Sequence, residues 1–210
     1  MFGSAITRFM ERFIEDEVVS GVVSVRSEFM YVGFGEGDDA GWFECAIQNG
    51  FAIRIVDFLP LALRNAQRYM EELKRKMRLS FLPVSYQRRD YVTAIDQKLE
   101  KQEKEGWENK KDYLFMCRLL ENDPNVEVAL GEIGKLLKMG MELVIVHPFG
   151  EDNPSYISAQ RSNGTWHSTA YTRAQILEYL CAGLGREPQI ARQCLIPFYD
   201  RNYTICVITI

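Results

Sequence analysis

The clearest pattern in the sequence is a row of apolar residues between positions 59 and 77. Its members are three or four positions apart: Leu59, Leu63, Ala66, Met70, Leu73 and Met77. This spacing places side chains along one stripe of an α-helix, so the sequence predicts a helix over 60–79. Pro60 stands in its first turn, where a missing amide proton costs nothing.

The N-terminal part of the chain predicts one helix and then strands. Residues 4–18 carry an apolar helical face whose polar side is acidic, and residues 22–34 are rich in β-branched and aromatic side chains. Two more such runs, 42–48 and 51–58, flank Asn49-Gly50, which is a strong hairpin signal. We therefore expect the three runs to form an antiparallel meander.

A helical section follows, from about residue 59 to residue 140. Apolar periodicity and the breaks at Pro83, Gly106 and Pro124 predict four helices, over 60–79, 90–105, 108–121 and 124–139. Gly140 can end the last of them in a left-handed conformation.

The C-terminal part predicts strands again, with Thr172 and Gln175 as a capping box for one helix. A short helix is expected near 188–193. The predicted strands are 143–146, one hairpin over 156–160 and 165–171, and a second hairpin over 195–199 and 203–210.

Together these elements predict an α+β fold. An antiparallel sheet, built from the N-terminal meander and the C-terminal hairpins, would accompany the helical middle section at about 59–140. With no repeat and no Ser/Gly-rich linker in the sequence, the favoured organisation is a single domain over 1–210. The alternative is two domains, 1–140 and 141–210.

Charge is unevenly distributed although the net charge is only −4. Residues 64–89 contain eight Lys and Arg against two Glu, whereas residues 1–45 contain three Arg against nine Asp and Glu. We call the first set the basic face: Arg64, Arg68, Lys74, Arg75, Lys76, Arg78, Arg88 and Arg89. Five of the nine acidic residues make up what we call the acidic face: Glu11, Glu15, Glu36, Asp38 and Asp39. Either face can steer a partner of opposite charge.

The sequence offers few groups for catalysis, and we assign no catalytic residue from it. His147 and His167 are the two histidines, and Cys45 is the thiol considered as their nucleophilic partner. No local motif supports that pairing. No Cys-x-x-Cys or His-x-x-x-His pair is present, so no metal site is expected.

The glycine-rich stretch Gly33–Gly37 contains Glu36 and is followed by Asp38 and Asp39. A phosphate cradle needs positive charge and a following helix, whereas this stretch is acidic and a strand is predicted after it. We therefore interpret it as a turn, in preference to a cation site, and expect no cofactor.

Composition favours a protein of the cytoplasm without a membrane role. The 210 residues contain no long uncharged apolar stretch, and acidic residues interrupt the first apolar positions. Five scattered cysteines fit reduced thiols.

These observations favour a cytosolic, non-enzymatic protein-binding module of the inhibitor, immunity or adaptor type. Phage-encoded inhibitors are proteins of this type. Its partner would be another protein, met through a charged surface. Two alternatives stay open. One is a nucleic-acid-binding protein that uses the basic segment 64–89 or a winged-helix-like unit near the C-terminus. The other is a cysteine-histidine hydrolase.

Overall fold

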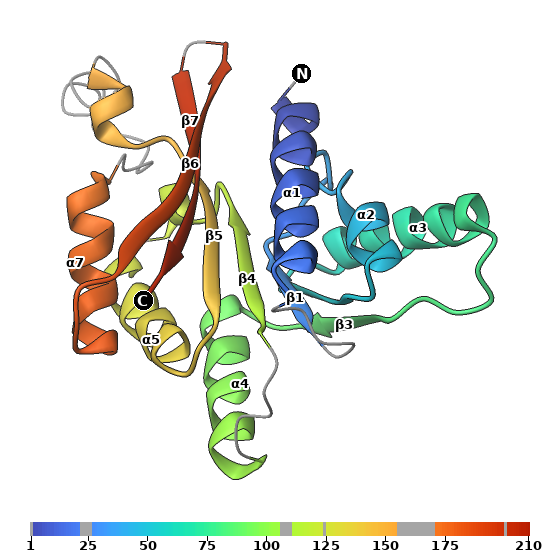
Figure 1. Cartoon of the computed structure of the whole chain (residues 1–210), viewed down its shortest axis with the longest axis horizontal. Coiled ribbons are helices and arrows are strands. Elements are labelled where there is room, and N and C mark those ends of the chain that lie inside the picture. The colour runs from blue at the N-terminus through green and yellow to red at the C-terminus, as the bar shows by residue number, and fades with distance from the viewer. Residues whose placement is uncertain (1, 22–26, 106–110, 124, 155–170, 200) are drawn as a thin grey trace. The chain divides into compact units, whose positions relative to one another are not determined.

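The structure is a computed structural model that describes residues 2–21, 27–105, 111–123, 125–154, 171–199 and 201–210 (Figure 1). The chain packs as two units, unit 1 from Met1 to Phe115 and unit 2 from Met116 to Ile210. In unit 1 the strands β3 (Val84–Arg88), β2 (Ala52–Asp57) and β1 (Glu28–Val32) are neighbours in that order, and in unit 2 the order is β5 (Glu142–His147), β7 (Arg201–Thr209) and β6 (Gln189–Phe198). In the part of the chain that is described, no helix combines the length and the apolar character needed to cross a bilayer.

Unit 1 alternates strands with helices. Its elements are α1 (Phe2–Val19), β1 (Glu28–Val32), α2 (Phe43–Gln48), β2 (Ala52–Asp57), α3 (Pro60–Met77), β3 (Val84–Arg88) and α4 (Tyr91–Glu105). β4 (Tyr113–Cys117) runs across the division between the units. β1 pairs in parallel with β2, and β2 pairs in parallel with β3. Parallel neighbours need a crossover, which α2 and α3 provide.

Aromatic rings fill the core of unit 1. The Phe29 ring lies 4.7 Å from that of Tyr113 and 4.9 Å from that of Trp42, and Tyr31 stacks on Phe115 at 4.9 Å. These side chains are fully buried. They come from β1, β4 and the start of α2, so the aromatic core fixes the segment between β1 and α2.

The described residues of unit 2 include the helices α5 (Val126–Lys138) and α7 (Arg173–Leu184) and a β-hairpin. Its elements are η1 (Leu120–Asn122), α5 (Val126–Lys138), β5 (Glu142–His147), η2 (Gly150–Asp152), α7 (Arg173–Leu184), β6 (Gln189–Phe198) and β7 (Arg201–Thr209). β7 pairs antiparallel with both β5 and β6. The predicted capping box of Thr172 and Gln175 is present at the start of α7.

The helices α5 and α7 approach each other through glycines (Figure 1). A Cβ atom added to Gly183 would lie 1.7 Å from the carbonyl oxygen of Gly131, and one added to Gly134 would lie 2.2 Å from that of Leu180. The two backbones are therefore in direct contact, and no larger residue fits at Gly183.

The predicted meander is wrong. Residues 43–48 form the helix α2 and not a strand, and Asn49-Gly50 ends that helix, with Gly50 at φ 85°. A type I′ hairpin turn would need positive φ at both residues, but Asn49 has φ −91°. The chain instead crosses over from β1 to the parallel strand β2.

The prediction of helices alone between about 59 and 140 is also wrong, because β3 and β4 lie within this section. The range of the predicted helix 108–121 contains β4, whose five residues are all buried. A strand buried on both faces loses alternation and resembles a buried helix in its hydrophobic pattern.

Several predicted elements are confirmed. The helices expected over 4–18, 60–79, 90–105 and 124–139 correspond to α1, α3, α4 and α5, and the last hairpin corresponds to β6 and β7. The short helix expected near 188–193 lies in β6 instead, so the winged-helix-like unit is absent. The hairpin over 156–171 lies almost wholly outside the described residues, and so does His167.

Candidate functional site

A glycine-rich loop follows β1. Gly33, Gly35 and Gly37 have φ of 77°, 55° and 79°, which glycine adopts without steric cost. The Gly33 N–H donates to the Val56 carbonyl of β2 at 2.9 Å. Nothing lies within 4 Å of a Cβ atom built at Gly35, so the loop backbone there is open to a ligand.

Asp57, the last residue of β2, holds this loop in place. Its carboxylate accepts one hydrogen bond from the Gly35 N–H at 3.2 Å and another from the Leu59 N–H at 2.8 Å. The residue is only 6% exposed. One buried carboxylate therefore ties the loop after β1 to the start of α3.

The end of β3 meets the same edge of unit 1. The Arg89 N–H donates to the Asp57 carbonyl at 3.2 Å. Next to it, Asp90 accepts hydrogen bonds from the N–H and hydroxyl of Thr93 at 2.8 and 2.6 Å, and these bonds hold the pKa of Asp90 below its usual value. The carboxyl ends of three parallel strands thus gather around Asp57, which is where open α/β sheets bind ligands.

This edge also exposes apolar surface. Phe58 is 62% exposed and Leu61 is 61% exposed, although both are large apolar side chains. Phe58 directly follows Asp57, and Leu61 lies on the first turn of α3. A flat apolar group bound beside the Asp57 carboxylate would cover them.

The loop itself is acidic. Glu36 and Asp38 are exposed, whereas Asp39 is buried and accepts a hydrogen bond from the Tyr31 hydroxyl at 2.6 Å. The negative charge disfavours a phosphate ligand and favours a ligand that carries positive charge.

The first helix braces this loop. A Cβ atom added to Gly3 of α1 would lie 1.9 Å from the Asp38 carbonyl oxygen, and one added to Gly41 would lie 2.5 Å from the Thr7 hydroxyl. α1 therefore packs backbone to backbone against the end of the loop.

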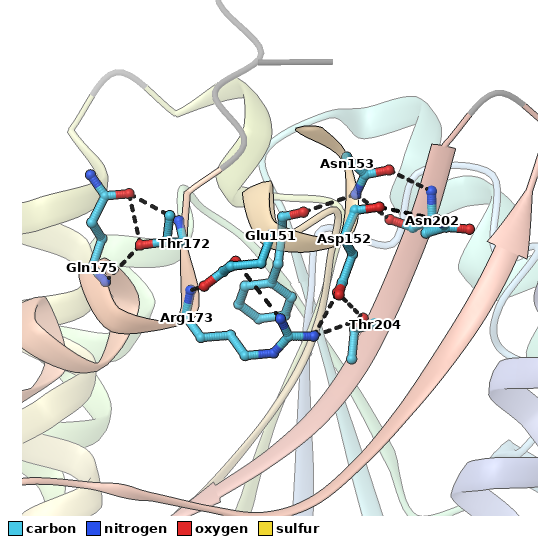
Figure 2. Close-up of polar contacts among 9 residues, drawn as sticks. Glu151, Asp152, Asn153, Thr172, Arg173, Gln175, Asn202 and Thr204 are labelled. Atoms are coloured by element: carbon cyan, nitrogen blue, oxygen red, sulfur yellow. Dashed lines mark hydrogen bonds and ion pairs between the residues drawn. The ribbon is translucent and has the colours of Figure 1, made fainter. Parts of the chain in front are cut away.

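Unit 2 contains a second polar cluster, at the start of α7 (Figure 2). Asp152 accepts hydrogen bonds from Arg173 at 2.5 Å and from the Thr204 hydroxyl at 2.6 Å. The Arg173 backbone N–H donates to Glu151 at 2.8 Å, and its guanidinium lies 4.6 Å from the centre of the Phe149 ring. The cluster joins η2, α7 and β7, which is a structural role.

His147, at the end of β5, is 0% exposed, and neither ring nitrogen has a hydrogen-bond partner in the described part of the chain. Burial lowers the pKa of His147 to about 3. The imidazole is therefore neutral at pH 7. Burial likewise raises the pKa of the nearby Cys206 thiol to about 11, so this thiol is not a thiolate at pH 7.

We expect His147 to make unit 2 sensitive to acid. Its pKa is lower in the folded than in the unfolded state, so protons bind the unfolded state preferentially as the pH falls below about 6.5, and stability falls by up to about 1.4 kcal/mol per pH unit. Between pH 6.5 and pH 5 the loss should reach about 1.5–2 kcal/mol. Urea denaturation of the wild type and of His147→Leu at both pH values checks this. The free energy of unfolding of the variant should fall less between pH 6.5 and pH 5 than that of the wild type, and equal losses would contradict the prediction.

The sequence-predicted residues are placed as follows. On the basic face all residues are exposed except Lys74, which is half-buried, and Lys76 forms an ion pair with Glu44. On the acidic face Glu15, Glu36 and Asp38 are exposed, Glu11 is half-buried, and Asp39 is buried against Tyr31. Asp39 is therefore not part of a docking surface.

Cys45 does not have the environment of a nucleophile. Burial and the neighbouring carboxylates of Glu11 and Glu15 raise the pKa of its thiol, whereas a reactive cysteine needs a lowered one. Cys45 belongs to unit 1 and His147 to unit 2.

The sequence analysis missed Asp57 as a functional residue and interpreted Gly33–Gly37 as a turn. A usable signal was present: Asp57 follows Gly33 by 24 residues and ends an apolar strand, which resembles the spacing of nucleotide-binding loops. The acidic residues and the mistaken strand at 42–48 concealed it.

No protein-family model and no curated protein matches this sequence. Among solved structures, the chain is similar to an arsenic(III) S-adenosylmethionine methyltransferase from Chlamydomonas reinhardtii, with 13% identity and a TM-score of 0.54 over 87% of this chain and 62% of that one. It is also similar to S-adenosylmethionine-dependent methyltransferases from Anabaena variabilis and Clostridium acetobutylicum. The first has 12% identity and a TM-score of 0.57 over 94% of this chain and 83% of that one. The second has 12% identity and a TM-score of 0.56 over 95% of this chain and 90% of that one.

These neighbours overturn two expectations. The antiparallel α+β fold is wrong, because the neighbours have a mostly parallel seven-stranded sheet. The interpretation as a non-enzymatic protein-binding module of the inhibitor or immunity type is corrected too, because the neighbours are enzymes. The chain has the Rossmann-like α/β fold of S-adenosylmethionine-dependent methyltransferases.

Proposed function

We propose that this protein is a methyltransferase that uses S-adenosylmethionine as its methyl donor. The observation that carries the proposal is the hydrogen bond between the Gly35 N–H and the Asp57 carboxylate, which joins the glycine loop after β1 to the acidic end of β2. In Rossmann-like folds these two features bind a nucleoside: the glycines allow close approach, and the acid accepts from the ribose hydroxyls.

The residues fit this donor. Each Asp57 oxygen accepts one backbone N–H and has a further lone pair for a sugar hydroxyl. Phe58 and Leu61 offer apolar surface for the adenine ring. S-adenosylmethionine carries no phosphate and has a sulfonium and an ammonium group, which suits the acidic Glu36 and Asp38. The acidity that argues against a phosphate cradle thus favours this donor.

When bound, S-adenosylmethionine supplies a methyl group from its sulfonium to a nucleophilic acceptor. The acceptor gives up a proton, and the donor becomes S-adenosylhomocysteine. In this proposal the chain positions the donor. Asp57 orients its ribose, and the backbone at Gly35 packs directly against the donor. Phe58 shields the adenine ring from water. The chain spans 62% of the length of the arsenic(III) methyltransferase.

Donor binding should be measurable without knowledge of the acceptor. S-adenosylhomocysteine at about 100 times its Kd should stabilise the protein by about 2.7 kcal/mol, which raises Tm by roughly 5–10 °C for a chain of this size. Thermal unfolding with increasing S-adenosylhomocysteine checks this. ATP at the same concentration is the control, because its phosphates would meet Glu36 and Asp38. A shift with ATP alone, or with neither compound, would count against the proposal.

We further propose that the protein acts in the cytoplasm. None of the five cysteines, all of which lie in the described residues, forms a disulfide, as is typical of a reducing compartment.

A further inference from the structure

The basic face is formed by α3 and by the end of β3, which lies next to Asp57 in unit 1. Arg64, Arg68 and Arg75 project from the exposed side of α3, and Arg88 and Arg89 end β3 next to Asp57. α3 packs on β3, and residues 78–83 connect them (Figure 1). The basic residues therefore belong to one continuous part of unit 1, although they are separated in sequence.

Most of this positive charge is not ion-paired within the part of the chain that the structure describes. Among the described residues, no ion pair involves Arg64, Arg68, Arg78, Arg88 or Arg89, whereas Lys76 is paired with Glu44. The acidic residues on the same helix are Glu71 and Glu72. A protein with a net charge of −4 thus keeps a local excess of arginine facing water.

The arginines are accompanied by exposed rings. Phe81 is 74% exposed in the connection between α3 and β3, and Tyr86 on β3 is 37% exposed and close to Glu71. Arginine binds phosphate with a fixed pair of donors, and bases stack on exposed rings. Arg64 and Arg75 are about 16 Å apart along the helix, the length of roughly five stacked nucleotides.

We propose that the basic face binds a single-stranded nucleic acid, with arginines on the phosphates and Phe81 and Tyr86 under the bases. A membrane surface fits less well, because the apolar stripe of α3, from Ala62 to Leu73, is buried in the protein and cannot insert into lipid. The proposal does not depend on methyl transfer, since it concerns binding to unit 1 without any donor.

Binding of fluorescent oligonucleotides of about 12 nucleotides, one of RNA and one of DNA, tests the proposal. Each should bind in low salt and be released as the salt concentration rises. The salt slope, which is the slope of log K against log salt concentration, is set by the number of phosphates that the protein contacts. Arg68→Gln with Arg75→Gln should weaken binding about tenfold or more and reduce the slope by about 1.4, that is about 0.7 for each phosphate contact. The matched control is Arg8→Gln with Arg12→Gln on α1, an equal change of charge at exposed positions that should leave affinity and slope close to wild type.

The stacking contribution is tested separately. Phe81→Ala should weaken binding about tenfold with no change in the salt slope, whereas Tyr199→Ala, which removes a ring 94% exposed in unit 2, should leave affinity unchanged. Tighter binding of RNA or of DNA identifies the natural strand, and either supports the proposal. No binding of either strand in low salt would overturn it. So would equal losses in the two double variants, or equal affinity for anionic vesicles or polyglutamate.

Discussion

Replacing Asp57 by alanine should weaken donor binding by roughly two orders of magnitude in Kd. The variant loses the acceptor for the sugar hydroxyls and also releases the Gly35 N–H, so the loop is no longer held at the end of β2. Hydrogen bonds to a charged group contribute about 1.5–3 kcal/mol each. A loss of about 3 kcal/mol corresponds to a Kd raised roughly 150-fold.

Titration calorimetry with S-adenosylhomocysteine measures this change. Glu72→Ala is the matched control, because it removes an exposed carboxylate on α3 that lies away from the strand ends. The Asp57 variant should also melt somewhat earlier, since the N–H groups of Gly35 and Leu59 lose their acceptor. If the folded Asp57 variant binds as tightly as wild type, the glycine loop and β2 do not form the donor site.

Replacing Gly183 by alanine should strongly destabilise unit 2. The added Cβ atom would stand 1.7 Å from the Gly131 carbonyl oxygen, so α7 has to move away from α5 by more than an ångström. That movement separates Gly134 from Leu180 and disturbs the core of unit 2, in which Ile133 and Leu137 are also fully buried. We expect a loss of about 4 kcal/mol or more in the free energy of unfolding.

Urea denaturation measures the loss, and the same helix pair supplies the control. A Cβ atom added to Gly131 meets nothing within 4 Å, so Gly131→Ala should be neutral or should stabilise the protein by up to about 1 kcal/mol through its helix propensity. Two glycines of one interface should thus respond in opposite directions. Equal stability of Gly183→Ala and the wild type would mean that α5 and α7 are not in backbone contact.

The sequence predicts the amphipathic helices well, because one buried stripe repeats clearly along α3 and α5. It fails at β4, where every residue is buried and the pattern has no period, and at β3, whose sequence Val84–Arg88 is mainly polar. Without these two strands, the alternation of strand and helix that identifies an α/β fold is lost.

The candidate site was only partly accessible from sequence. The glycines were recognised, but their role depends on α2 following the loop and on Asp57 lying next to Gly35, a contact between residues 22 positions apart in the chain. Asn49-Gly50 suggested a hairpin because glycine with positive φ also ends helices. Pairing direction, parallel or antiparallel, is a tertiary property that this local signal does not carry.

The strand β4 has a consequence for any attempt to recombine this protein with its structural neighbours. It contributes Tyr113–Phe115 to one unit and Met116–Cys117 to the other. A crossover placed at the packing boundary would divide the strand in the middle of its buried run and leave each parent with an unmatched fragment. Chimaeras should therefore exchange sequence on either side of residues 113–117, so that this strand is inherited whole.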